Sequence, residues 1–422
     1  MTIESVHEHG LFSDRYMQDP YRVFAELRRV GPIHRAKTPS GISVWVVTGH
    51  AEVSAALADR RLCKDSARLR AIIDRATPPG LDGSHVGEMV ATDMLNSDPP
   101  EHTRLRKLVA QGFSARRIER LRPLVRQLTD ELLDAMVVRA ADGSVDFIDA
   151  FAFPLPLTVI CELLGIPRAD QRSFRAWSTV VVGSSSRDQL RRATTAMGGY
   201  LAQTMAAKRS APGDDLLSDL VEASDTGDRL TPLELVSMAC LLLIAGHETT
   251  VNLLGSALLA LLEHPDQFAR LRERPELVDA AVEETLRYDS PAPVTTWRYA
   301  AEPMSIHGSP IATNDLVLLA LGAANHDARI PDPDAFDIER RITGHLSFGH
   351  GTHFCLGAAL ARMEAQVALG RLVERFPDIT LAVPVGELRR RPSVVMHGLV
   401  DLPVRLGRQP TTSAVPGTGT AG

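Results

Sequence analysis

Cysteine, aromatic residues and net charge are all scarce in this chain of 422 residues. Four cysteines are too few for a disulfide scaffold and are typical of a reducing compartment. Aromatic residues make up 5% of the chain and the net charge is -6. A base-stacking surface would need more aromatic residues, and a site that neutralises phosphates would need an excess of positive charge. We therefore expect no binding of nucleic acid.

A targeting or membrane-spanning segment is also not visible. The first residues lack a cationic stretch followed by an apolar one. The longest nearly apolar run, 235–246, is about half as long as a bilayer requires. We therefore expect a soluble, cytoplasmic protein that does not bind membranes.

Helical periodicity dominates what is present. Apolar residues recur at three- and four-residue spacing over 21–30, 101–111, 115–139, 189–208, 276–288 and 358–376. Strand-forming residues concentrate only in 43–48, 316–320 and 402–406. The fold class is therefore expected to be mainly α with a small β part. The stretch 77–87 indicates a long loop, and 407–422 is predicted to be a disordered tail because it has almost no apolar bulk.

The strongest helix signal begins at Thr231. Thr231 and Glu234 form a capping box around Pro232, and the pattern then stays apolar to Leu262, which predicts a helix through the core. The segment 245–250, Ala-Gly-His-Glu-Thr-Thr, interrupts this pattern, since a glycine and a buried glutamate are both costly there. Either the helix is kinked at this point, with the glutamate capping a neighbouring loop, or the segment is a functional site.

Cys355 lies in a second unusual segment, 346–358, where glycines frame it and a predicted helix follows directly. Glycines let a backbone approach a bulky group, and a helix N-terminus favours a thiolate. Three interpretations compete: an inert core cysteine, a zinc site with His350 and His353, or a single axial thiolate on heme iron. Zinc would need a fourth ligand that no second cluster supplies, so the pattern favours heme.

The cysteine segment resembles the heme-binding loop of the cytochrome P450 superfamily at Phe348, Gly349, Gly351, His353, Cys355 and Gly357. Glu284 and Arg287 resemble that family's Glu-x-x-Arg pair, and 245–249 resembles its oxygen-binding groove. The likeness extends from about Tyr16 to Leu406. It implies a single cytochrome P450 domain over 1–406 around a buried heme b, where the length alone suggests two or three domains.

The resemblance also implies a role for each matching residue. Cys355 would be the axial ligand of the iron. The other residues expected to bind the heme or its propionates are His102, Arg106, Arg298, His353, Ala245 and Gly246. Thr249 and Glu248 would relay protons to oxygen. From helix geometry rather than from the resemblance, Thr250 points about 100° away from Thr249 and is expected to pack elsewhere. His247 is expected to point outward or cap, with a proton relay as its alternative role.

Substrate and partners are inferred more loosely. The resemblance points to Leu241, Ile244, Val294 and Val395 (or Met396) as substrate contacts, with 69–95 and 177–188 as a lid. The stretch from Glu101 to Arg126 contains eight basic residues and two acidic ones. This excess indicates either a docking surface for an acidic ferredoxin or an ordinary solvated pair of helices.

The sequence thus predicts a monomeric bacterial monooxygenase. It would hydroxylate or epoxidise an apolar small molecule of polyketide, macrolide, steroid or terpene type, with O2 and electrons from ferredoxin and ferredoxin reductase. One alternative is a peroxide-driven or non-hydroxylating heme-thiolate enzyme, against which the presence of both Glu248 and Thr249 argues. The other is a heme-dependent ligand sensor without turnover.

Overall fold

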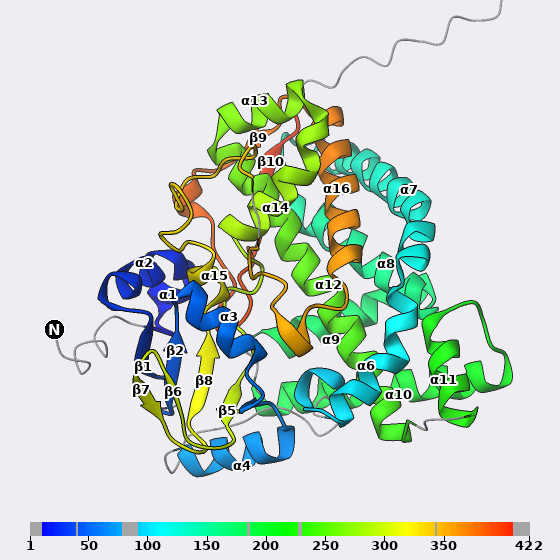
Figure 1. Cartoon of the computed structure of the whole chain (residues 1–422). Coiled ribbons are helices and arrows are strands. Elements are labelled where there is room, and N and C mark those ends of the chain that lie inside the picture. Colours follow the sequence, from blue (N-terminus) through cyan, green and yellow to red (C-terminus); the bar gives the residue numbers. More distant parts are fainter. Residues whose placement is uncertain are drawn as a thin grey trace, which may run out of the picture.

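The computed structural model describes residues 11–38, 41–77, 92–183, 186–226, 230–341 and 344–407. Helices fill most of the molecule and the larger sheet lies at one side, near α2 and α3 (Figure 1). The helices are α1 Asp14–Gln18, α2 Pro20–Val30, α3 His50–Ala58, α4 Ser66–Ala76, α6 Glu101–Ala110, α7 Ala115–Arg139, α8 Pro154–Leu164, α9 Gln171–Val182, α10 Arg187–Ser210, α11 Leu216–Thr226, α12 Pro232–Glu263, α13 Pro265–Glu273, α14 Val278–Tyr288, α15 Leu321–Ala324 and α16 Ala358–Arg375. The strands are β1 Ile33–Lys37, β2 Ser43–Val47, β3 Leu62–Cys63, β4 Val145–Asp146, β5 Arg298–Ala300, β6 Met304–Ile306, β7 Ser309–Ile311, β8 Leu316–Leu319, β9 Thr380–Leu381 and β10 Pro403–Arg405.

The main sheet joins strands from both halves of the chain, in the order β1-β2-β8-β5-β3. β2 and β8 pair in parallel, with Val44 opposite Leu316, and the other pairs are antiparallel. Because side chains alternate along a strand, Val44 and Val46 enter one apolar cluster while Trp45 and Val47 enter another on the opposite face. Both faces are covered, which explains why β2 is apolar at successive positions.

α12 is the central helix of the larger, helical core. Its capping box forms as predicted: the Thr231 N–H donates to Glu234 Oε2 at 2.7 Å, and the Glu234 N–H donates to Thr231 Oγ1 at 3.2 Å. The helix is long and apolar enough to cross a membrane, but 78% of its most apolar window is buried inside the protein. It packs on α8, α10, α14 and α16, so its apolar surface is that of a core helix.

The predicted elements are largely confirmed. All six helical runs and all three strand runs appear within a few residues of the expected positions, although 276–288 starts with a 3-10 turn before α14 begins at Val278. Segments 78–91, 184–185 and 408–422 lie outside the described residues. The predictions of a loop over 77–87, of the central parts of the lid and of a disordered tail fall wholly or mostly there. The domain boundary at 406 therefore stays a prediction.

Candidate active site

A cavity separates the middle of α12 from the cysteine segment. From α12 it is lined by Ala245, Gly246, Thr249, Thr250 and Leu253. The opposite wall contains Phe348, Cys355, Gly357, Leu360 and Ala361, and the side walls contain Phe113, Leu286, Pro291, Ala292 and Ser347. The two unusual segments of the sequence therefore face each other across one mostly apolar space.

Glycines shape the loop that carries Cys355. Gly349 and Gly351 both have φ of 72°, a left-handed conformation that favours glycine. A Cβ on Gly351 would also lie 3.2 Å from the Ala58 Cα at the end of α3. The Cys355 N–H donates to the Phe348 carbonyl at 2.8 Å and closes the loop.

The Cys355 side chain is exposed at the cavity wall, just before α16 begins. Desolvation by the surrounding protein raises the pKa of its thiol, whereas the Gly357 N–H and the Arg106 guanidinium act in the opposite direction. Zinc is not supported as the metal, because no three His, Cys, Asp or Glu side chains come together as a metal site in the described parts of the chain.

Four predicted basic residues converge beside the cavity from three elements. His102 and Arg106 come from α6, Arg298 from β5, and His353 from the turn before Cys355. The His102 and His353 rings lie 4.4 Å apart between centroids. The Arg106 guanidinium donates to the Phe354 carbonyl at 2.7 Å, and Arg298 Nη1 donates to the Leu62 carbonyl at 3.2 Å.

These basic groups fit an anionic ligand. His102 is 2% exposed and Arg298 is 4% exposed. Within the described structure, both ring nitrogens of His102 and Nε of Arg298 are buried without a hydrogen-bond partner. Buried polar groups are normally paired, so this cluster needs an acceptor. The two propionates of a heme, whose iron Cys355 could bind, meet that need.

Lys64 belongs to the same cluster and was missed by the sequence prediction. It follows β3, is 3% exposed, and shares the electrostatic environment of Arg298 and His353. Its local sequence, Cys-Lys-Asp before α4, is typical of a polar turn. Only the fold shows that Lys64 is buried.

The acid and hydroxyl of α12 have different surroundings. Thr249 lies at the cavity wall, and its hydroxyl donates to the Ala245 carbonyl at 2.9 Å. Glu248 is 1% exposed and lies outside the cavity lining, with Oε2 3.2 Å from Arg391 Nη1. Burial raises the pKa of Glu248, but His247 and Arg391 outweigh it and hold the pKa below its usual value. Thr250, expected to pack elsewhere, also lines the cavity.

The prediction that His247 points outward is wrong. Its side chain is fully buried, with Nδ1 2.7 Å from the Leu243 carbonyl and Nε2 3.1 Å from Ser178 Oγ. Nε2 also lies 3.3 Å from Glu248 Oε1. α9 covers this face of α12, and nothing in the local sequence pattern shows that neighbour. His247 therefore helps to hold Glu248.

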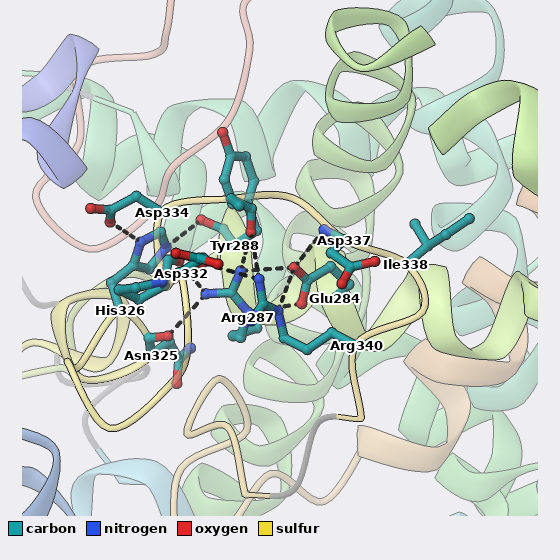
Figure 2. A network of polar contacts seen from close by, with 12 residues as sticks. Glu284, Arg287, Tyr288, Asn325, His326, Asp332, Asp334, Asp337, Ile338 and Arg340 are labelled. Carbon is teal, nitrogen blue, oxygen red and sulfur yellow. Dashed lines mark hydrogen bonds and ion pairs between the residues drawn. The ribbon is translucent and has the colours of Figure 1, made fainter. Parts of the chain in front are cut away.

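Glu284 and Arg287 form a buried framework behind the site, as expected. Arg287 pairs with both Glu284 oxygens at 2.8 Å and donates to carbonyls of the segment 325–335 (Figure 2). The Asn325 amide in turn donates to Ser347 Oγ at 2.8 Å. The pair thus fixes the segment that holds the start of the cysteine loop.

The four predicted substrate contacts do not line this cavity. Leu241 and Ile244 lie on α12 in the turn that precedes Ala245, and Ile244 packs against the helical core. Val294 is buried in one of the sheet clusters, and Val395 packs against that cluster. Their assignment remains a prediction.

Comparison with known proteins agrees with this geometry. A family profile described as Cytochrome P450 matches residues 184–381. The chain is 48% identical to cytochrome P450 107B1 of Saccharopolyspora erythraea, with 96% of this chain and 100% of that protein covered. It is 46% identical to cytochrome P450 monooxygenase PikC of Streptomyces venezuelae, with 94% of each covered.

The fold is likewise similar to that of solved structures. The tirandamycin C-bound P450 monooxygenase TamI superposes with a TM-score of 0.87 and is 47% identical, with 93% of this chain and 99% of that chain covered. Identity at this level over nearly the whole of both chains carries the family's heme-thiolate chemistry with it. The chain is therefore a monooxygenase that belongs to the cytochrome P450 family.

Proposed function

We propose that this monooxygenase hydroxylates or epoxidises an apolar polyketide- or macrolide-type molecule, with heme b as cofactor and electrons from a ferredoxin and its reductase. The observation that carries the proposal is the cavity itself. Cys355 and Thr249 line it from opposite walls, and the buried cation cluster lies beside it. We place the protein in the cytoplasm as a monomer.

Each residue has a defined task in this proposal. Cys355 holds the iron, and the propionates pair with His102, Arg106, Arg298 and His353. Ala245 and Gly246, which line the cavity from α12, would also contact the bound heme. Bound heme supplies oxygen activation.

Protons reach the cavity through two residues of α12. Thr249 holds water at the cavity wall and passes a proton inward. Glu248, a carboxylate beside His247 and Arg391, takes up a proton from the solvent side, where 25% of the Arg391 side chain is exposed, and passes it on toward Thr249. An enzyme driven by peroxide would need neither residue, so their presence favours the oxygen-dependent reaction over that alternative.

The substrate class rests on relatives and on the apolar cavity. PksS of Bacillus subtilis, 38% identical, is named for polyketide biosynthesis, and a mycinamicin IV hydroxylase/epoxidase of Micromonospora griseorubida is 39% identical. A vitamin D(3) 25-hydroxylase of Pseudonocardia autotrophica is 44% identical, which keeps a steroid-like substrate as a second candidate. Leu241, Ile244, Val294 and Val395 would contact the substrate beyond the cavity.

The ferredoxin surface is smaller than the sequence suggests. Arg104 is ion-paired with Glu101 and Glu234, and Arg117 with Asp219. Four exposed residues of this stretch form no ion pair within the described residues, namely Lys107, Arg116, Arg120 and Arg126. We take Lys107 and Arg116, near the turn between α6 and α7, as the contacts for ferredoxin.

A ligand screen followed by turnover tests the proposal. The purified holoenzyme is titrated with macrolides, other polyketides, steroids and terpenes while the low-to-high-spin shift is recorded. Ligands that bind are then incubated with ferredoxin, ferredoxin reductase and NADPH, and products one oxygen heavier are sought by mass spectrometry. Product only with peroxide contradicts the proposed electron source, and binding without any product indicates a ligand sensor.

A further inference from the structure

Lys64 is a buried cation that the activity described so far leaves without a role. Lys64 is 3% exposed and directly follows the short strand β3. A lysine normally extends its head group to water, and a buried one needs an anion nearby. The fold therefore holds this ammonium in place for a partner.

The surroundings of Lys64 are predominantly basic. It lowers the pKa of His353 together with Arg298, and it also lowers the pKa of His102. Burial and Arg298 lower the pKa of Lys64 itself to about 7. The hydrogen bonds agree with this placement: Arg298 donates to the carbonyl of Leu62, two residues before Lys64, and Asp98 accepts the backbone N–H groups of both Lys64 and His102. Lys64 therefore lies beside residues assigned to the propionates.

The nearby acids Asp93 and Asp98 act on the Lys64 ammonium and raise its pKa, but each carboxylate also accepts backbone N–H groups. Asp98 Oδ2 accepts the N–H groups of Lys64 and Asp65 at 2.8 and 2.9 Å. Asp93 is fully buried, and its Oδ1 accepts the N–H groups of Leu95 and Asn96 at the turn Met94–Asn96. Burial raises the pKa of Asp93 to about 7, and Lys64 acts in the opposite direction, so the two groups influence each other. The cluster keeps an excess of positive charge that a dianionic ligand would balance.

We propose that Lys64 is a fifth basic contact of the heme propionates, and that Asp93 holds Lys64 in position. This inference rests on the proposed heme cofactor but not on the proposed substrate or electron donor. It links the turn at Asp93, which follows the segment 78–91, directly to the cofactor. Lys64 is a cofactor-binding residue and Asp93 is a positioning residue.

The holoenzyme with Lys64→Met provides the test, with Lys37→Met on the exposed edge of β1 as the matched control. Two quantities are measured: the propionate bending mode in the resonance Raman spectrum, and the rate of heme transfer to excess apomyoglobin. Lys64→Met should shift the mode and speed heme loss by about tenfold, as expected for a lost hydrogen bond to a charged group. Lys37→Met should change neither, and Lys64→Arg should restore both in large part.

Other outcomes overturn the inference. An unchanged bending mode in Lys64→Met, with or without faster heme loss, means that Lys64 only supports the local structure. Lys64→Gln takes the place of the methionine variant if the latter does not accumulate. Asp93→Asn should shift the mode in the same direction but less, and no shift removes Asp93 from the proposal. A parent chain that binds no heme would instead contradict the proposed function.

Discussion

Glu364 on α16 is a buried carboxyl group that no neighbour satisfies. Both of its oxygens are buried without a hydrogen-bond partner among the described residues, and burial raises its pKa well above the usual value. The folded protein therefore keeps a proton on Glu364 at pH values where the unfolded chain, with a pKa of about 4.3, has lost it. Between the two pKa values the folded state binds more protons, so stability falls as the pH rises.

Glu364→Gln should remove this pH dependence. Relative to the variant, the parent should lose up to about 1.4 kcal/mol of unfolding free energy per pH unit above about pH 5. Urea denaturation of both proteins from about pH 5 to about pH 8 measures the difference. Glu387→Gln, at an exposed position, should keep the parent's slope. Parallel curves for parent and Glu364→Gln would mean that the buried carboxyl is ionised and hydrated.

Thr249→Ala should keep heme and substrate binding but uncouple electron use from product formation. The iron ligand and the cavity walls remain, while the hydroxyl that organises proton transfer is lost. General acid-base assistance is worth about 10²–10⁴-fold, so product per electron should fall steeply and peroxide should appear. Product, peroxide and NADPH consumption are measured together.

Glu248→Gln serves as the comparison for Thr249→Ala. It removes the charged group that supplies protons, so total turnover should fall rather than coupling. If Thr249→Ala stays as well coupled as the parent, the hydroxyl is a packing group. The proton route would then pass through other groups at the wall, with Thr250 as the next candidate.

At the scale of elements, α12 and α8 approach closely at Gly246. A Cβ on Gly246 would lie 2.8 Å from Ile160 Cδ1 and 2.9 Å from Cγ1. The glycine therefore permits close packing of the two helices. The sequence left open a kinked helix or a functional site at 245–250; α12 is helical without interruption there, and Gly246 also lines the cavity.

Gly246→Ala should lower the unfolding free energy by roughly 1–2 kcal/mol, because overpacking costs more than the gain in helix propensity. Ile160→Val removes the nearest atom, so the double variant should recover part of the loss in a double-mutant cycle. Gly199→Ala on α10 is the control: nothing lies within 4 Å of its Cβ, and it should stabilise the protein by about 0.5–1 kcal/mol. A stabilised Gly246→Ala would show that Ile160 moves aside freely.

The sequence predicts where helices and strands lie better than it predicts which segments pack against each other. α7 matches the predicted 115–139, and α12 ends one residue beyond the predicted Leu262, because periodicity and capping are local properties. The position of Cys355 follows from its motif. The burial of His247 and Lys64 depends on segments far away in the sequence, and no local pattern carries that information.

At the scale of the whole molecule, net charge and local charge differ in sign. The chain carries -6 overall, yet Lys107, Arg116, Arg120 and Arg126 are exposed basic residues of α6 and α7 without an ion pair among the described residues. Lys107→Gln and Arg116→Gln should slow reduction by ferredoxin at low ionic strength and have little effect at high salt, since screening weakens charge steering. Stopped-flow reduction under carbon monoxide measures the rate.

Arg29→Gln is the control for this surface. It makes the same change in total charge at an exposed position of α2, in a different part of the molecule (Figure 1). Equal rates in all variants and in the parent, at both salt concentrations, would place the ferredoxin elsewhere.

The pairing of β2 with β8 has a consequence for how the protein folds during its synthesis. During synthesis, Lys64 and His102 leave the ribosome long before Arg298, His353 and Cys355. About two thirds of the chain separates β2 from β8, so β2 cannot pair with β8 until that much more of the chain has been made. A nascent chain stopped before β8 can form its early helices but cannot complete the sheet, and one stopped before Cys355 has the sheet but not the iron ligand. A heme held through Cys355 can therefore be bound only after most of the chain has been synthesised.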